Sequence, residues 1–72
     1  MNAYDIDLGC WERGISIRLE AKDLDACLAM AEGSLRKEIE SGTIPADSII
    51  VQITQDGRAI YDYMNGAYNL KP

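Results

Sequence analysis

Hydrophobic and polar residues alternate with a period of two near the start of the chain. Two segments share this pattern, with apolar side chains at Tyr4, Ile6, Leu8 and Cys10 and then at Ile15, Ile17 and Leu19. A short connection containing Gly14 separates the two segments. Alternation on both sides of such a connection predicts a β-hairpin whose apolar residues face the core. Trp11 is then expected on the opposite face or at the strand end.

The middle of the chain has the period of an amphipathic helix. Apolar residues recur at spacings of three and four, at Leu24, Cys27, Leu28, Ala31, Leu35 and Ile39. Asp23 is a suitable N-cap, Gly42 occupies the usual position after a helix, and Pro45 prevents the helix from resuming. These signals predict a helix over about residues 23–41. Gly33, which costs about 1 kcal/mol within a helix, is expected either to permit close approach to a sheet or to mark a weak point.

A second hairpin is predicted over residues 48–64. Residues 48–54 are rich in β-branched side chains, and Asp56-Gly57 is a preferred pair for a two-residue turn. In the simplest register Ile53 opposes Ile60. The face toward the helix then carries Ile49, Val51, Ile53, Ile60 and Met64, and the other face carries Ile50, Gln52, Thr54, Ala59, Tyr61 and Tyr63. Asp62 falls on the helix face, which indicates either a sheet margin or a register wrong by one residue.

These elements predict one α+β domain over residues 1–72. Its order is ββαββ, with a single amphipathic helix packed on one face of an antiparallel sheet. Because no second helix is predicted, the other face of the sheet is left without a cover, and Trp and Tyr often anchor protein interfaces. The candidate interface residues are Trp11, Tyr61, Tyr63, Asp5, Asp7, Glu20 and Ile50. In the alternative, Tyr61 and Tyr63 are ordinary strand residues and Trp11 covers one end of the core.

Composition and charge narrow the class of protein. The chain is 47% hydrophobic and 26% charged, as in ordinary globular proteins. A net charge of −5 disfavours direct binding to nucleic acid and to anionic membranes, and favours a partner with a basic surface. No apolar run approaches the roughly 20 residues of a membrane span. Residues 1–5 lack the features of a secretory signal, so we expect a cytoplasmic protein.

Candidate catalytic chemistry is sparse. The chain contains no histidine, and its two cysteines, Cys10 and Cys27, fall on predicted core faces without an activating base. We expect both to be reduced thiols, with a disulfide as the alternative. No glycine-rich phosphate loop and no Cys/His metal pattern occurs, so no cofactor, metal or catalytic residue is predicted.

Three functional hypotheses follow from these features. The first is a non-catalytic inhibitor or regulator that occupies a surface of a larger protein, a profile shared by phage-encoded inhibitors of host defence such as anti-CRISPR proteins. The second is a self-associating assembly subunit, a homodimer formed through the open sheet face or a sheet edge. The third and least favoured is a divalent-metal protein or enzyme that uses Asp5, Asp7 and Glu20.

Overall fold

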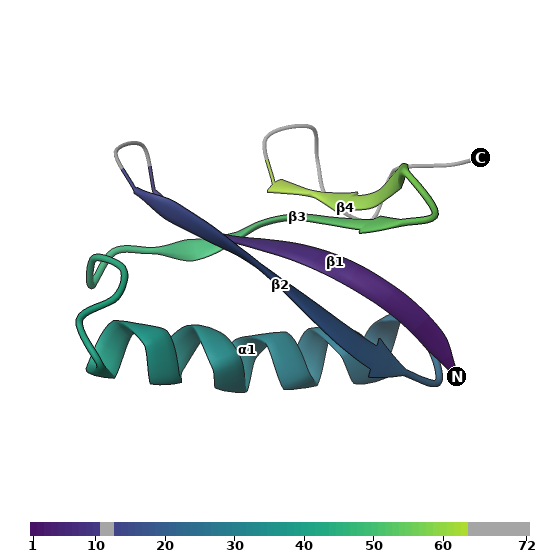
Figure 1. The fold of residues 1–72 in the computed structure, drawn as a ribbon, viewed down its shortest axis with the longest axis horizontal. Helices are drawn as coiled ribbons and strands as arrows, with labels where there is room; N and C mark the ends of the chain where they lie inside the picture. Colours follow the sequence, from purple (N-terminus) through teal and green to yellow (C-terminus); the bar gives the residue numbers. More distant parts are fainter. Residues whose placement is uncertain (11–12, 64–72) are drawn as a thin grey trace.

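The computed structural model describes residues 1–10 and 13–63, which form four strands and one helix (Figure 1). In chain order the elements are β1 (Asn2–Gly9), β2 (Gly14–Ala21), α1 (Leu24–Glu40), β3 (Ile49–Gln55) and β4 (Arg58–Asp62). The strands form one open antiparallel sheet in the order β2-β1-β3-β4. The predicted α+β fold with ββαββ order is therefore confirmed.

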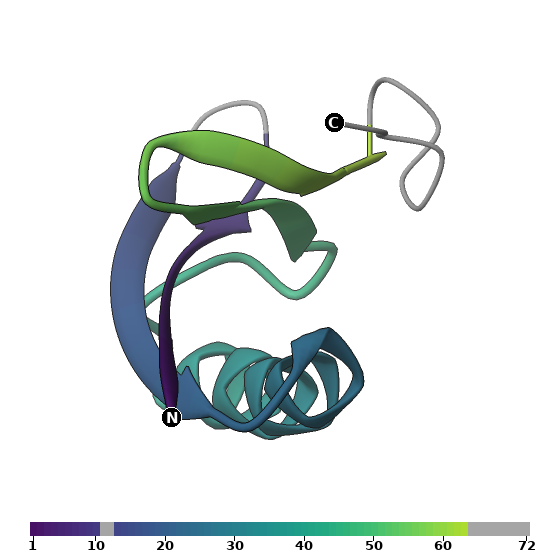
Figure 2. The same ribbon diagram turned by 90° about the vertical axis from the view of Figure 1, so that its right-hand side faces the viewer.

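The helix lies along one side of the sheet, and the sheet curves above it from β2 to β4 (Figure 2). The first hairpin has an unbroken ladder, in which Ile6 pairs with Ile17 and Tyr4 with Leu19. Directly opposed residues of an antiparallel pair share a face of the sheet. The apolar rows of β1 and β2 therefore lie together on the α1 side, as their period of two predicts.

The start of α1 follows from local chemistry. The Asp23 side chain caps the helix, and its Oδ1 atom accepts a hydrogen bond from the Ala26 backbone N–H at 2.9 Å. This bond satisfies one of the backbone donors that a helix start leaves without a partner. Gly33 lies on the exposed side of α1, where an added Cβ would meet no atom within 4 Å. Of the two alternatives for Gly33, close approach to the sheet is therefore excluded.

The end of α1 is a Schellman motif. Gly42 has a φ of +81°, and its N–H donates to the Ile39 carbonyl at 3.1 Å. The Thr43 N–H donates to the Glu38 carbonyl at 3.0 Å. Glycine adopts this left-handed conformation without the steric cost that a Cβ brings, so Gly42 ends the helix where the sequence predicts.

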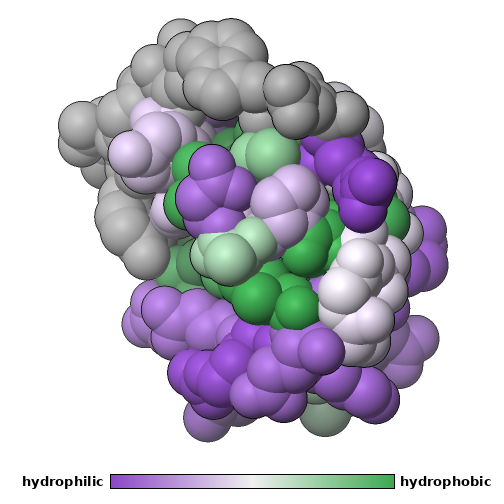
Figure 3. Space-filling view, turned by 90° about the vertical axis from the view of Figure 1, so that its left-hand side faces the viewer, coloured by the Kyte–Doolittle hydropathy of each residue, from purple (hydrophilic) through white to green (hydrophobic). Residues whose placement is uncertain are grey.

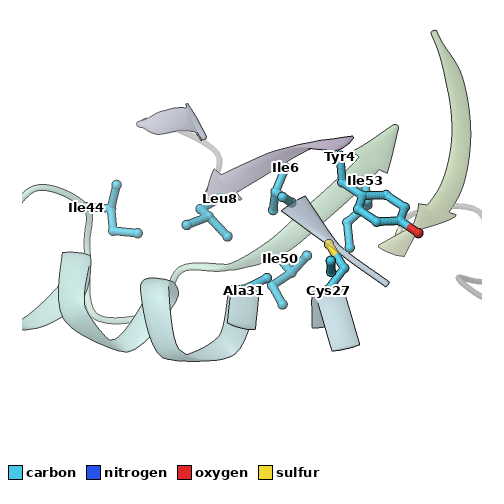
Figure 4. Close-up of a cluster of buried hydrophobic side chains, with 9 residues drawn as sticks. Tyr4, Ile6, Leu8, Cys27, Ala31, Ile44, Ile50 and Ile53 are labelled. Atoms are coloured by element: carbon cyan, nitrogen blue, oxygen red, sulfur yellow. The ribbon is translucent and has the colours of Figure 1, made fainter. Parts of the chain in front are cut away.

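The hydrophobic core lies between the sheet and α1 (Figure 4). Its buried members are Tyr4, Ile6, Leu8, Ala21, Cys27, Ala31, Ile44, Ile50 and Ile53. Ile6, Cys27 and Ile53 have no exposed surface. Ile44 comes from the connection between α1 and β3, beyond the periodic segments, and was not predicted to belong to the core.

A β-bulge in β3 alters the predicted faces of that strand. In the ladder with β1, Asp7 pairs with Gln52 and Leu8 pairs with Ile50, so the ladder skips Val51. Because Val51 has no partner on β1, the residues of β3 that precede it face the opposite side of the sheet from the one that simple alternation predicts. As a result Ile50 joins Ile53 in the core and is 7% exposed, whereas Val51 is half-buried. The prediction that Ile50 lies on the face away from the helix is wrong.

A second bulge alters β4. The turn at Asp56-Gly57 and the pair Gln55–Arg58 follow the prediction, but Thr54 then pairs with Ala59 and Ile53 with Tyr61, so the ladder skips Ile60. Beyond this point the register differs by one residue from the predicted one.

Asp62 shows why the shifted register is favoured. The shift places Asp62 opposite Gln52, on the face away from Ile53. There its Oδ2 accepts a hydrogen bond from Gln52 Nε2 at 3.3 Å. The bulge at Ile60 therefore takes the carboxylate off the apolar core face; Asp62 is still buried, and the hydrogen bond from Gln52 offsets part of its desolvation.

Candidate functional site

The candidate site is the outer face of the sheet, which is the face opposite α1. On β1 and β2 this face carries the residues that alternate with the core row, namely Ala3, Asp5 and Asp7 on β1 and Ser16, Arg18 and Glu20 on β2. These positions follow from the period of two and the continuous register of the first hairpin. The face away from the helix therefore carries Asp5, Asp7 and Glu20, as predicted.

Cross-strand polar contacts organise this outer face. The Arg18 guanidinium forms an ion pair with Asp5, with 3.1 Å between Nη1 and Oδ1. The Ser16 hydroxyl donates a hydrogen bond to Asp7 Oδ1 at 2.6 Å. The side chains of Asp5 and Arg18 are 51% and 68% exposed, so water screens their attraction and the pair contributes little to stability. Both carboxylates remain accessible to a partner.

Glu20 completes the acidic set of the first hairpin. It is exposed and stands opposite Ala3, at the far side of Arg18 from Ser16. Arg18 is the only basic residue within β1 and β2, against the three carboxylates of Asp5, Asp7 and Glu20. The face of this hairpin therefore has a net negative charge that only one guanidinium offsets.

The acidic groups of the described residues form no metal centre. Within residues 1–10 and 13–63, no three His, Cys, Asp or Glu side chains lie close enough together to hold a metal ion. Asp5 is engaged by Arg18, and Asp7 by Ser16. The described part of the chain thus gives no support to the hypothesis of a divalent cation held by Asp5, Asp7 and Glu20.

The aromatic candidates do not gather on the outer face as predicted. Tyr61 lies opposite Ile53, so its side chain shares the α1 side of the sheet and packs against the core. The bulge at Ile60 is the reason for this correction. Tyr63 follows β4 and is 56% exposed. The predicted role of Trp11 lies outside the described residues, as does the predicted pairing of Met64.

A shallow hollow of about 270 Å³ lies near the turn of the first hairpin. It is lined by Asp7, Leu8, Gly9, Cys10, Gly14, Ile15, Ser16 and Val51. The hollow is open and lacks the enclosed shape of a small-molecule site.

The surface of one side of the molecule is shown in Figure 3. It has apolar residues at its centre and hydrophilic residues below them.

Both cysteines are free thiols, in accord with the predicted reduced state. Cys27 is fully buried on α1, and Cys10 is partly buried after β1. Burial raises the pKa of the Cys27 thiol, because a thiolate is disfavoured away from water. Cys27 is therefore a poor nucleophile, as expected of a core cysteine.

Comparison of the chain with protein-family models, with curated proteins and with solved structures finds no match. Within the described residues, no helix combines the length and hydrophobicity that a membrane span requires. The functional argument therefore depends on the sheet, its charges and its edges.

Proposed function

We propose that this chain is a small, acidic, non-catalytic protein-binding module that inhibits or regulates a larger protein by occupying a basic surface on it. The observation that carries the proposal is the outer face of the first hairpin. Asp5, Asp7 and Glu20 lie there on the side opposite α1, with Arg18 as the one basic residue of the two strands. Such a face complements a positively charged surface.

The charge of the whole chain supports the same kind of partner. A net charge of −5 accelerates encounter with a basic protein and makes binding sensitive to salt. A groove that binds nucleic acid has the required positive potential, because it must neutralise phosphates. A nucleic-acid-binding protein of the kind blocked by phage-encoded anti-defence inhibitors is one candidate target.

The state of the cysteines favours a site of action in the cytoplasm. Cys10 and Cys27 are both free thiols, one partly buried and the other fully buried. Free thiols persist in reducing compartments, whereas small secreted domains usually depend on disulfides. We therefore place the proposed binding event in the cytoplasm.

Affinity capture with a face variant tests the proposal. The bait proteins are the wild type and a triple variant that neutralises the outer face, Asp5→Asn/Asp7→Asn/Glu20→Gln. The matched control removes the same number and types of charge from exposed positions elsewhere, in Asp25→Asn/Glu32→Gln/Asp47→Asn. Circular dichroism on all three proteins confirms that each is folded.

We expect one larger basic protein to be retained by the wild type and the control and lost by the face variant. Binding of that purified protein should weaken steeply as salt concentration rises, because the contact is between opposite charges. A partner held equally by all three baits would show that the outer face is not the binding surface. A partner lost equally by both triple variants would show that only net charge matters.

A further inference from the structure

The two edges of the sheet differ in a way that makes one of them available for pairing. β2 and β4 are the edge strands. β4 has five residues and is interrupted by the bulge at Ile60, whereas β2 has eight residues in an unbroken ladder with β1. Bulges and short strands protect an edge from pairing, and a long regular strand does not. In Figure 2, β2 forms the margin of the ribbon, with no described element beyond it.

Apolar surface accompanies the β2 edge. The core-facing residues of β2 are Ile15, Ile17 and Leu19, and all three remain partly exposed although they pack against the core. Their partners on β1, namely Leu8, Ile6 and Tyr4, are at most 3% exposed. An antiparallel strand paired with residues 17–21 of β2 would cover the exposed surface of Ile17 and Leu19. Pairing at this edge would therefore bury apolar surface in addition to forming backbone hydrogen bonds.

The charged residues of β2 are complementary to those of a second, antiparallel copy of the same strand. Arg18 and Glu20 lie two positions apart on the outer face. If two copies of β2 pair antiparallel about a twofold axis at Leu19, Arg18 of each copy faces Glu20 of the partner subunit. An axis at Arg18 would instead bring two guanidinium groups together, and an axis at Ile17 would leave Glu20 facing a glycine. Opposite charges on directly opposed positions stabilise a strand pair, and like charges destabilise it.

We propose that the chain forms a homodimer through antiparallel pairing of β2 with β2 of a second copy, centred on Leu19. The two four-stranded sheets join into one continuous sheet. Arg18 then stands between Asp5 of its own chain and Glu20 of the partner subunit, so that negative and positive groups alternate across the interface. Because the axis is perpendicular to the sheet, both acidic outer faces lie on the same side of the dimer.

Charge reversal and its reciprocal complementation test this interface. Arg18→Glu and Glu20→Arg each convert both cross-strand contacts of the homodimer into like-charge contacts. We expect each variant to dimerise about tenfold or more weakly than the wild type, by analytical ultracentrifugation over a range of concentrations. The charge-matched controls, Arg36→Glu and Glu32→Arg on the exposed side of α1, should dimerise like the wild type.

Mixing the two weakened variants provides the decisive measurement. In a mixture of Arg18→Glu and Glu20→Arg, each contact across the pair again joins opposite charges, so heterodimers should form where each variant alone is monomeric. This recovery also excludes misfolding as the reason for the loss. A monomeric wild type at every concentration would overturn the proposal, and so would a dimer that both substitutions and their mixture leave unchanged. Both measurements use the purified chain alone, so they are independent of any larger partner.

Discussion

Tyr61 lies directly opposite Ile53 in the ladder between β3 and β4, although the simplest hairpin register opposes Ile53 with Ile60. The bulge at Ile60 accounts for the difference and turns the Tyr61 ring toward the α1 side of the sheet. The same shift takes Asp62 to the outer face, where Gln52 donates a hydrogen bond to it. The extra residue in β4 thus places the Tyr61 ring beside the core, on the face where the simple register would place the Asp62 carboxylate.

Truncation of Tyr61 tests this placement. Because the ring packs against the core, Tyr61→Ala should lower the free energy of unfolding by about 2 kcal/mol, measured by urea denaturation. The matched control is Tyr63→Ala, which removes the same ring from a residue that is 56% exposed and should change stability by less than about 0.5 kcal/mol. The simple register places Tyr61 with Tyr63 on the face away from α1, so a loss for Tyr61→Ala as small as that for Tyr63→Ala would contradict the bulge at Ile60.

The bulge in β3 makes an equally specific prediction about neighbouring residues. Ile50→Asp should unfold the domain, because it places a carboxylate without a partner in the core. Val51→Asp affects a half-buried residue that the ladder skips, and should cost only about 1 kcal/mol. Circular dichroism distinguishes the two outcomes. Simple alternation predicts the reverse order, so an unfolded Val51→Asp beside a folded Ile50→Asp would contradict the bulge.

Two glycines should respond to alanine in opposite directions. Gly33 lies on the exposed side of α1 with open space around it, so Gly33→Ala should raise the free energy of unfolding by about 0.5 to 1 kcal/mol. Gly42 has a φ of +81°, which a Cβ strains, so Gly42→Ala should lower it by about 1 kcal/mol. Thermal denaturation of both variants measures the two signs. Destabilisation by Gly33→Ala would mean that this side of the helix is covered.

Burial of Cys27 predicts a dependence of stability on alkaline pH. The pKa of this thiol is raised in the folded state, so above the ordinary thiol pKa the unfolded chain releases a proton that the folded chain retains. The stabilisation is complete below the ordinary thiol pKa and is lost as the pH rises through the folded value. Urea titrations at increasing pH should show a smaller alkaline loss in Cys27→Ala than in the wild type. Equal losses in the two proteins would contradict the prediction.

Local patterns along the chain determined much of the architecture. The period of two predicted the first hairpin and its outer row of Asp5, Asp7 and Glu20, because alternation assigns faces wherever a ladder is continuous. The helix ends followed from Asp23 and Gly42, whose capping chemistry acts within a few residues. The turn at Asp56-Gly57 was equally local.

The tertiary structure alone decided which residues of the second hairpin face the core. Val51 and Ile60 are ordinary strand residues, and nothing in their types marks a bulge. Bulges at these two residues are favoured because they let β3 pair with β1 and β4 while Ile50, Ile53 and Tyr61 pack in the core. Asp62 was the one sign in the sequence, because simple alternation placed its charge on the core face. Packing and desolvation across the whole sheet therefore determine the register, and the local period of the sequence does not encode them.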